Sequence, residues 1–325
     1  MKPAVFKIIA NGSDITRLIK DRLVRLTLRD EAGVKSDAVT IELDNRDLAI
    51  ELPSTGAKLE VWIGIGKELE FKGSYQVTEL EEPLDEELLT ISATAAEFKT
   101  SSIKSPKDRT FDAITYGDLV KQIAQDHGLS PVVSESLAKI EFEHIDQVAE
   151  SDLNLLNRLG RQYDAIAKPV ADRLLVTPKA EGKSASGQLM SETVIDDPAN
   201  SSGRVTITER TNYQTIIAHW FDEEAQQKRS VKVGNGEEPV YTMRRQYQSE
   251  QEARDAAKAE FDKQARGKKT LSLSRPLMPE LTAELRVLLK NHKPSANGLW
   301  IVETVEHVIE PDSVSSTTAT LVTPK

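Results

Sequence analysis

The stretch that decides the fold is Gln147-Val148-Ala149-Glu150-Ser151-Asp152-Leu153-Asn154-Leu155-Leu156-Asn157-Arg158-Leu159. Ser151 is a favoured helix N-cap, because its hydroxyl can accept a hydrogen bond from a backbone N–H in the first turn. Leucines recur after it at spacings of three and four, which places them on one face of a helix. The stretch predicts a capped amphipathic helix, with Arg158 facing outward or paired.

The segments on either side of this helix predict a small α+β unit over residues 101–180. The polar run 101–108 marks a domain boundary. A helix is expected to begin after Thr115, which with Asp118 forms a capping box, and to end at Gly128. A short hairpin is expected after the signature helix, over residues 165–177.

Residues 1–100 predict strands, because apolar and polar residues alternate with a period of two. Polar turns at regular spacing suggest a barrel or a sandwich. Gly64 and Gly66 lie inside a strand pattern, where they predict a bend or a close backbone approach. The acidic residues around Pro83 are best explained as a solvated hairpin tip rather than a metal loop.

Residues 181–325 form a second β-rich segment with one helix over 249–267, capped by Ser249 and Glu252. The stretch 180–203 is the loosest part of the chain and predicts a linker or an extended connection. A turn is expected at Gly234-Asn235-Gly236, between two strands. The order of a β region, an α+β region and a β region raises the possibility that the two β regions are structural duplicates.

The composition excludes several classes of protein. The chain has 325 residues, of which 42 are basic and 52 acidic, giving a net charge of −10 that disfavours wrapping of nucleic acid. It has no cysteine, which removes disulfides, thiolate metal sites and cysteine nucleophiles. No apolar run approaches the roughly 18 residues of a membrane span. We therefore expect no direct insertion into a membrane.

No residue of the sequence is expected to have a catalytic, cofactor-binding or metal-binding role, and no cofactor is expected. The five histidines lack paired metal-site spacing, and a structural role is favoured for each: His127, His144, His219, His292 and His307. Gly182-Lys183-Ser184 resembles the tail of a phosphate-binding loop, but Thr177 occupies the position of the required glycine. Catalytic carboxylates need no sequence signature, so an enzyme is disfavoured rather than excluded.

Residues 147–159 resemble the "Q-x-x-E-S-D-x-x-F-L-x-R-L" signature of contractile-tail hub proteins, with Leu155 in place of phenylalanine. These are the late control protein D family of temperate myophages and the N-terminal part of the type VI secretion spike protein VgrG. Near the C-terminus, residues 298–307 resemble the family's "G-x-W-x-V-x-x-V-x-H". The chain departs from the family at 279–285, where a proline–glycine turn is common and no glycine is present.

The resemblance implies an α+β, mainly β protein with two β-barrel-like tube domains, 1–100 and 181–325, and an α+β insertion, 101–180. It implies a structural protein without enzymatic activity, the trimeric baseplate hub of a contractile phage tail or prophage-derived particle. Such a hub joins the hexameric tail tube to the trimeric spike and contacts the tape-measure protein and other baseplate proteins. DNA is only a transient cargo, for which the net charge predicts a neutral or negative channel lining. The hub is assembled in the host bacterial cytoplasm and resides in the virion tail baseplate.

Three alternatives remain. The chain is also similar to the hub of a type VI or extracellular contractile injection system. A carboxylate-based hydrolase using an acidic cluster is a distant alternative, which predicts a deep pocket with paired acids. A module binding nucleic acid or cell-wall glycan predicts a basic or aromatic-lined groove, and the low aromatic content of 5% argues against it.

Overall fold

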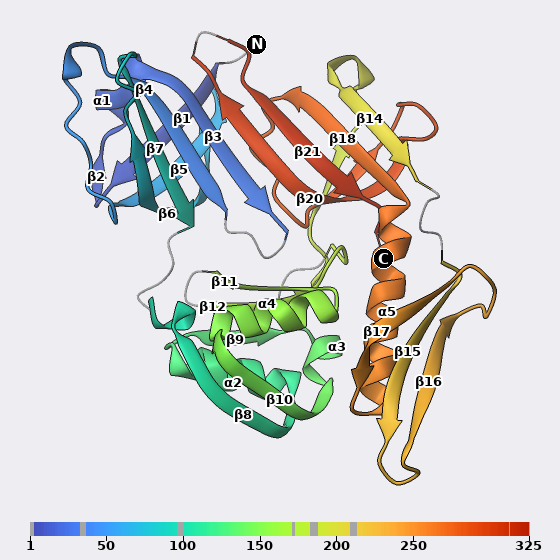
Figure 1. Cartoon of the computed structure of the whole chain (residues 1–325). Coiled ribbons are helices and arrows are strands. Elements are labelled where there is room, and N and C mark those ends of the chain that lie inside the picture. Colours follow the sequence, from blue (N-terminus) through green and yellow to red (C-terminus); the bar gives the residue numbers. More distant parts are fainter. Residues whose placement is uncertain are drawn as a thin grey trace. The chain divides into compact units, whose positions relative to one another are not determined.

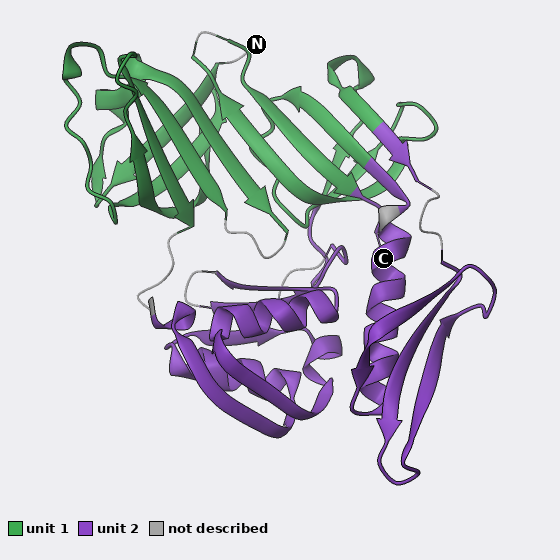
Figure 2. Cartoon of the chain, in the orientation of Figure 1, with its two compact units in different colours: residues 1–97, 192–204, 271–321 green, residues 98–191, 205–270, 322–325 purple. Residues whose placement is uncertain are grey.

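The computed structural model describes residues 3–32, 37–95, 101–170, 173–182, 188–208, 213–311 and 313–324. Strands make up 53% of it and helices 20%, so the predicted α+β, mainly β class is confirmed. Contacts divide the chain into two compact units, shown in green and purple in Figure 2. Unit 1 comprises residues 1–97, 192–204 and 271–321, and unit 2 comprises residues 98–191, 205–270 and 322–325. The β-rich segment 181–325 therefore contributes residues to both units.

Unit 1 is built on one 13-stranded sheet (Figure 1). The strands from the N-terminal segment are β1 (Ala4–Ala10), β2 (Ser13–Asp14), β3 (Leu23–Glu31), β4 (Ala38–Asp44), β5 (Lys58–Ile65), β6 (Glu68–Glu81) and β7 (Leu88–Ala95). The strands from the C-terminal segment are β13 (Glu192–Ile195), β14 (Ser202–Ile207), β18 (Lys269–Pro276), β19 (Arg286–Leu289), β20 (Gly298–Ile309) and β21 (Ser316–Val322). The unit boundary falls within β14, within β18 and before the last residue of β21. Short helical turns complete this part: α1 (Thr16–Ile19), η1 (Lys20–Arg22), η2 (Arg46–Leu48) and η4 (Pro198–Asn200).

The predicted alternation places one face of each strand in the core. In β5, Leu59, Val61 and Ile63 are buried while Lys58 and Glu60 are exposed. Val24 in β3 differs from this pattern and is 45% exposed. The register of β3 against β4 shifts between Leu23 and Arg25, and this bulge turns Val24 out of the buried row.

The predicted close approach at Gly64 is confirmed. A Cβ atom at Gly64 would lie 1.7 Å from the carbonyl oxygen of Glu68, across the tight connection from β5 to β6. Gly66 in this connection has φ +69°, a conformation that glycine adopts without strain. The acidic tip predicted around Pro83 is the exposed loop between β6 and β7.

Two halves of the large sheet share one strand order. The N-terminal half runs β3-β4-β7-β6-β5-β1, and the C-terminal half runs β14-β18-β21-β20-β19-β13. The two-residue strand β2 adds to the edge of β1 and has no counterpart in the other half. When the remaining six strands of each half are numbered along the chain, both halves read 2-3-6-5-4-1. The first and fourth strands pair antiparallel in the N-terminal half and parallel in the C-terminal half, whereas the fourth and fifth strands pair antiparallel in both. The halves are joined where β3 pairs antiparallel with β20.

One part of unit 2 spans residues 101–182. Its elements are η3 (Ser101–Lys104), β8 (Pro106–Thr115), α2 (Tyr116–Asp126), β9 (Ser130–Val133), α3 (Glu135–Ala138), β10 (Glu141–Ser151), α4 (Asp152–Gln162), β11 (Ala165–Val170) and β12 (Arg173–Pro178). β8 pairs with β10, while β12 lies between β11 and β9. The predicted cap of α2 is confirmed, because the Thr115 hydroxyl accepts a hydrogen bond from the Asp118 N–H at 3.0 Å. The apolar faces of α2 and α4 share one core with the strands.

The rest of unit 2 packs one long helix on a three-stranded sheet. The elements are β15 (Thr215–Asp222), β16 (Gln227–Gly234), β17 (Val240–Tyr247) and α5 (Glu250–Gly267). The predicted turn at 234–236 joins β16 to β17, but these strands lie on opposite sides of β15. Ala253, Ala256 and Ala257 are fully buried, since their small side chains let α5 lie close to Ile216 and Ala218.

The stretch 180–203 contains more order than a linker. Residues 192–195 form β13, which pairs with β19, and Ser202 begins β14. Residues 183–187 lie outside the described part of the chain. Within the described part, no helix is both long and apolar enough to cross a membrane.

Candidate functional site

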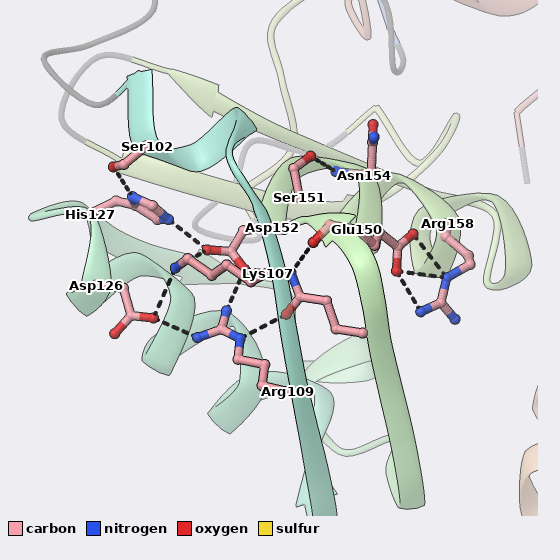
Figure 3. A network of polar contacts seen from close by, with 11 residues as sticks. Ser102, Lys107, Arg109, Asp126, His127, Glu150, Ser151, Asp152, Asn154 and Arg158 are labelled. Atoms are coloured by element: carbon pink, nitrogen blue, oxygen red, sulfur yellow. Dashed lines mark hydrogen bonds and ion pairs between the residues drawn. The ribbon is translucent and has the colours of Figure 1, made fainter.

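The signature stretch folds into a polar cluster at the beginning of α4 (Figure 3). Ser151 caps the helix as predicted: its hydroxyl accepts a hydrogen bond from the Asn154 N–H at 3.2 Å. Asp152, the first residue of the helix, is fully buried. A buried carboxylate is costly unless partners replace its water shell, so its contacts define the site.

Four side chains donate hydrogen bonds to the Asp152 carboxylate. Lys107 Nζ and His127 Nε2 each lie 2.7 Å from Oδ2, and Gln147 Nε2 lies 2.9 Å from Oδ1. The guanidinium of Arg109 also donates to Oδ1 through Nη2. The donors come from β8, from the C-terminal end of α2 and from β10, so this one carboxylate ties three elements to the start of α4.

A second carboxylate balances the two cations. Arg109 Nη1 donates to Asp126 Oδ2 at 2.7 Å, and Lys107 Nζ lies 3.6 Å from the same oxygen. Two acids therefore face two bases, and the formal charges of these four side chains cancel.

Gln147 reaches the cluster because β10 is irregular at this point. The register against β8 shifts between Gln147 and Glu150, and Ala149 has φ +45°. The Ala149 N–H is held by Asp108 Oδ1 at 2.7 Å, and Gln147 Nε2 also donates to the Glu150 carbonyl at 2.7 Å. The bulge thus turns the fully buried Gln147 towards Asp152.

Glu150 and Arg158 form the second contact of the signature. Arg158 Nη2 lies 2.8 Å from Glu150 Oε2, and Arg158 Nε lies 3.1 Å from Glu150 Oε1, so the pair is bidentate. Arg158 also donates to the Asp146 carbonyl at 3.0 Å. The prediction that Arg158 faces outward or pairs is thereby resolved in favour of pairing.

The electrostatics keep Asp152 ionised. Burial alone would raise the pKa of this carboxyl. Hydrogen bonds from Lys107, Gln147 and His127, together with the charge of Arg109, outweigh burial and lower the pKa below its ordinary value.

The cluster contains a serine–histidine–aspartate chain of contacts. Ser102 Oγ lies 2.9 Å from His127 Nδ1, and His127 Nε2 lies 2.7 Å from Asp152. In a hydrolase triad the carboxylate stabilises the imidazolium that forms during reaction. Here two cations, Lys107 and Arg109, already neutralise that carboxylate. The arrangement therefore favours a structural tie rather than an activated nucleophile.

The other predicted structural histidines occupy separate places in the chain. His144 lies 2.6 Å from Asp112 and 3.0 Å from Asp146, which raise its pKa. His219 belongs to β15, His292 bonds to Ser201 Oγ at 2.9 Å, and His307 is buried in β20. Lys183 and Ser184, of the loop-like Gly182-Lys183-Ser184, lie outside the described residues.

A cavity of about 530 Å³ bears on the hydrolase alternative. Its lining within unit 2 includes four acidic residues and two lysines: Glu141, Glu181, Asp255, Asp262, Lys139 and Lys258. The mixture of signs offsets the acidic charge and singles out no pair of carboxylates. Across the described ranges, no group of three or more potential ligands is arranged to hold a metal ion.

Sequence reasoning found the cap and the apolar face of α4 but missed the cluster. An aspartate after an N-cap is usually explained by the helix dipole, so nothing local marks Asp152 as buried. The missing signal lay 45 residues upstream, where Lys107 and Arg109 alternate along one face of β8. Only the pairing of β8 with β10 brings these residues to the signature.

The fold is shared with solved phage tail and type VI secretion proteins. The 43 kDa tail protein of prophage MuSo2 from Shewanella oneidensis superposes with a TM-score of 0.72 at 14% identity, covering 99% of this chain and 98% of that chain. The Escherichia coli c3393 protein, described as a component of the type VI secretion system, superposes with a TM-score of 0.58 at 10% identity, covering 94% of this chain and 74% of that chain. At these identities the likeness concerns the fold alone.

Sequence comparison gives the family. The model of the phage tail baseplate hub (GPD) family matches residues 53–313. The probable baseplate hub proteins of Escherichia phages 186 and P2 are 34% and 33% identical over 217 residues, which is 66% of this chain. The match spans 56% of each of these relatives, so it covers little more than half of their length. The chain belongs to the phage tail baseplate hub family.

Proposed function

We propose that the chain is the structural hub of a contractile phage tail baseplate, a trimeric ring that joins the hexameric tail tube to the trimeric spike. In this proposal the two half-sheets are the tube-like domains of segments 1–100 and 181–325, and residues 101–180 are the inserted domain. The observation that carries it is the shared strand order of the half-sheets. Three chains with two similar halves each present six similar surfaces, which is what docking on a hexameric tube end requires.

The polar cluster around Asp152 serves this function as a structural tie. It fixes the start of α4 to β8, α2 and β10 through charge-assisted hydrogen bonds. No reaction is assigned to it. The protein functions by binding other proteins through its surfaces. Its partners are the tail tube, the spike, the tape-measure protein and other baseplate proteins.

DNA passes through the ring as a transient cargo in this proposal. The net charge of −10 supports a neutral or negative channel lining, because a basic lumen would retain the DNA by releasing its counterions. The particle is assembled in the host cytoplasm, and the hub resides at the baseplate.

A hub of a type VI or extracellular injection system is the second candidate. The likeness to the c3393 protein favours it at the level of the fold. The phage candidate has the stronger support, because the family model and the curated relatives are phage hubs.

Electron microscopy of particles from the source bacterium, labelled with antibody against this chain, tests the function. We expect label at the baseplate end of the tube of particles with DNA-containing heads. Label along the tube or sheath, or on no particle at all, would overturn the proposal. Label on headless injection particles would replace the phage hub with the second candidate.

A further inference from the structure

We propose that β14 of one subunit pairs with residues 78–81 of β6 in the neighbouring subunit. The contact would repeat, between chains, the junction that β3 and β20 form within one chain. This inference rests on the proposed trimeric hub and names the surfaces that close it.

Each strand of one half-sheet has a counterpart at the same place in the other half-sheet. In the shared order, β3 and β14 are both the second strand of their half, and β20 and β6 are both the fifth. The internal junction therefore joins a second strand to a fifth strand. The other second strand is β14 and the other fifth strand is β6. These two take no part in the internal junction and can form the same contact with another chain.

The second strands also share a sequence. Arg25-Leu26-Thr27-Leu28 in β3 corresponds to Arg204-Val205-Thr206-Ile207 in β14, with arginine, aliphatic residue, threonine and aliphatic residue in the same order. Both strands therefore offer one cation followed by the same pattern of side chains along the edge.

The fifth strands share a backbone contact. In β6, the Val77 N–H donates to the Ala57 carbonyl at 2.9 Å, and the Gly56 N–H donates to the Val77 carbonyl at 2.8 Å. In β20, the Val302 N–H donates to the Leu285 carbonyl at 3.0 Å, and the Glu284 N–H donates to the Val302 carbonyl at 2.8 Å. Val77 and Val302 thus make the same contact with the turn before the fourth strand, although β20 runs three residues further from its valine to the following glutamate–proline step than β6 does.

Beyond these valines the two strands differ in their neighbours. In β20, residues 298–301 pair with β19, and residues 304–309 pair with β3. In β6, residues 68–76 pair with β5. Residues 78–81 of β6 form no backbone hydrogen bond with any described residue outside the ladder with β7. This part of β6 is the counterpart of the β20 edge that β3 covers.

β14 is the matching open edge. It ends the sheet, with β18 as its one neighbour in the described order. Its residues are exposed or half-buried, and Ile207 is 66% exposed. An exposed edge with an apolar residue is a template for pairing with another chain.

Charge complements the backbone edges. In the internal junction, Arg25 of β3 forms a 2.6 Å ion pair with Glu310, which directly follows β20 and precedes Pro311. The same glutamate–proline step directly follows β6, where it is Glu82-Pro83. Arg204 of β14 makes no ion pair with the described residues of its own chain. The geometry points to an ion pair between Arg204 and Glu82 of the next subunit.

The register follows from matching the two glutamate–proline steps, Glu310-Pro311 after β20 and Glu82-Pro83 after β6. Leu26 lies opposite Ile309 in the internal junction, so Val205 is expected opposite Glu81 of the next chain. The contact is heterologous, since two different edges meet, and such contacts close when the rotation completes a ring. Three copies would alternate internal and intersubunit junctions around the threefold axis.

Cysteine cross-linking tests the register, because the natural chain contains no cysteine. The full chain carrying Val205→Cys and Glu81→Cys is oxidised mildly and analysed on a non-reducing gel. We expect covalent dimers and trimers, whereas each single variant gives no species larger than a dimer. Val205→Cys combined with Glu60→Cys, an exposed position on β5, is the mismatched control and should give no trimer.

Charge reversal tests the ion pair. Arg204→Glu or Glu82→Arg alone should raise the concentration of half-assembly about tenfold, and the two together should restore it. Lys121→Glu, at an exposed position of α2, changes the charge equally and should leave assembly unchanged.

The outcomes separate this inference from the proposed function. If the natural chain is a trimer by light scattering, but the matched cysteine pair gives no cross-link and charge reversal does not change assembly, the strand contact is wrong and the hub stands. If the natural chain stays monomeric at high concentration and the cysteine pair gives no cross-link, both the strand contact and the trimeric hub are wrong. Cross-linked trimers from the matched pair alone support the contact.

Discussion

Asp152 is the residue on which the insertion depends most. It is fully buried and accepts hydrogen bonds from four side chains, two of them cations. Asp152→Asn keeps the size of the side chain but removes the charge that Lys107 and Arg109 face. We expect a loss of about 3 kcal/mol, because breaking a buried ion pair strands its partners. Amide hydrogen exchange in α4 measures this loss.

Glu150→Gln is the matched control for that variant. It weakens another ion pair of the signature, whose partners are partly exposed, so we expect a loss of less than about 1 kcal/mol. Equal effects of the two substitutions would contradict the central place of Asp152.

The contribution of Asp152 to the stability of the folded chain depends on pH. The pKa of Asp152 is lower in the folded chain than in the unfolded chain, so its contribution is complete above the unfolded value of about 3.9. The contribution is lost as pH falls through the folded pKa. The difference in α4 protection between the natural chain and Asp152→Asn should therefore shrink between pH 7 and pH 3, and a constant difference would be inconsistent with this assignment.

His307 predicts a second pH dependence, in unit 1. Burial, followed by the charge of Lys72, lowers the pKa of His307 to about 4. The unfolded histidine takes up a proton near 6.5, so stability falls as pH drops from 6.5 to about 4, by about 3 kcal/mol in total. NMR titration should find the ring protonating near pH 4, and a midpoint near 6.5 would refute this.

At the scale of elements, the turn before β19 carries conformational strain. The missing glycine at 279–285 corresponds to Glu284, which has φ +64°, while its counterpart before β5 is Gly56 with φ +91°. Glu284→Gly should stabilise the chain by about 1 kcal/mol, because glycine adopts this conformation without strain. Chemical denaturation measures the change.

Glu284→Ala separates strain from lost side-chain contacts. Alanine removes the same side chain but keeps the Cβ atom, so it should give none of the gain. A gain for alanine equal to that for glycine would show that the side chain, and not the backbone, was unfavourable.

Elements with strong local signals could be predicted from the sequence. The caps at Thr115, Ser151 and Ser249 and the alternation of β5 depend on neighbours in the chain, and all of them are present. The elements that sequence reasoning missed depend on distant partners. β13, which lies in the expected linker, is a strand because β19 lies beside it.

At the scale of the whole molecule, the sequence suggested duplication but gave no alignment. The strand order supplies one, because pairing is a property of the folded sheet and is absent from local periodicity. The polar cluster was hidden for the same reason, since its cations lie on a different strand from the signature. The functional proposal rests on the signature motif and the family match, and on no reactive group.

The molar mass of the full chain, measured by light scattering over a wide range of concentration, decides whether the chain assembles into the proposed ring. The trimeric hub predicts a species of three times 36.0 kDa that grows with concentration and that needs about tenfold more protein to form in Arg204→Glu. A chain that remains a 36.0 kDa monomer at the highest concentration would contradict it.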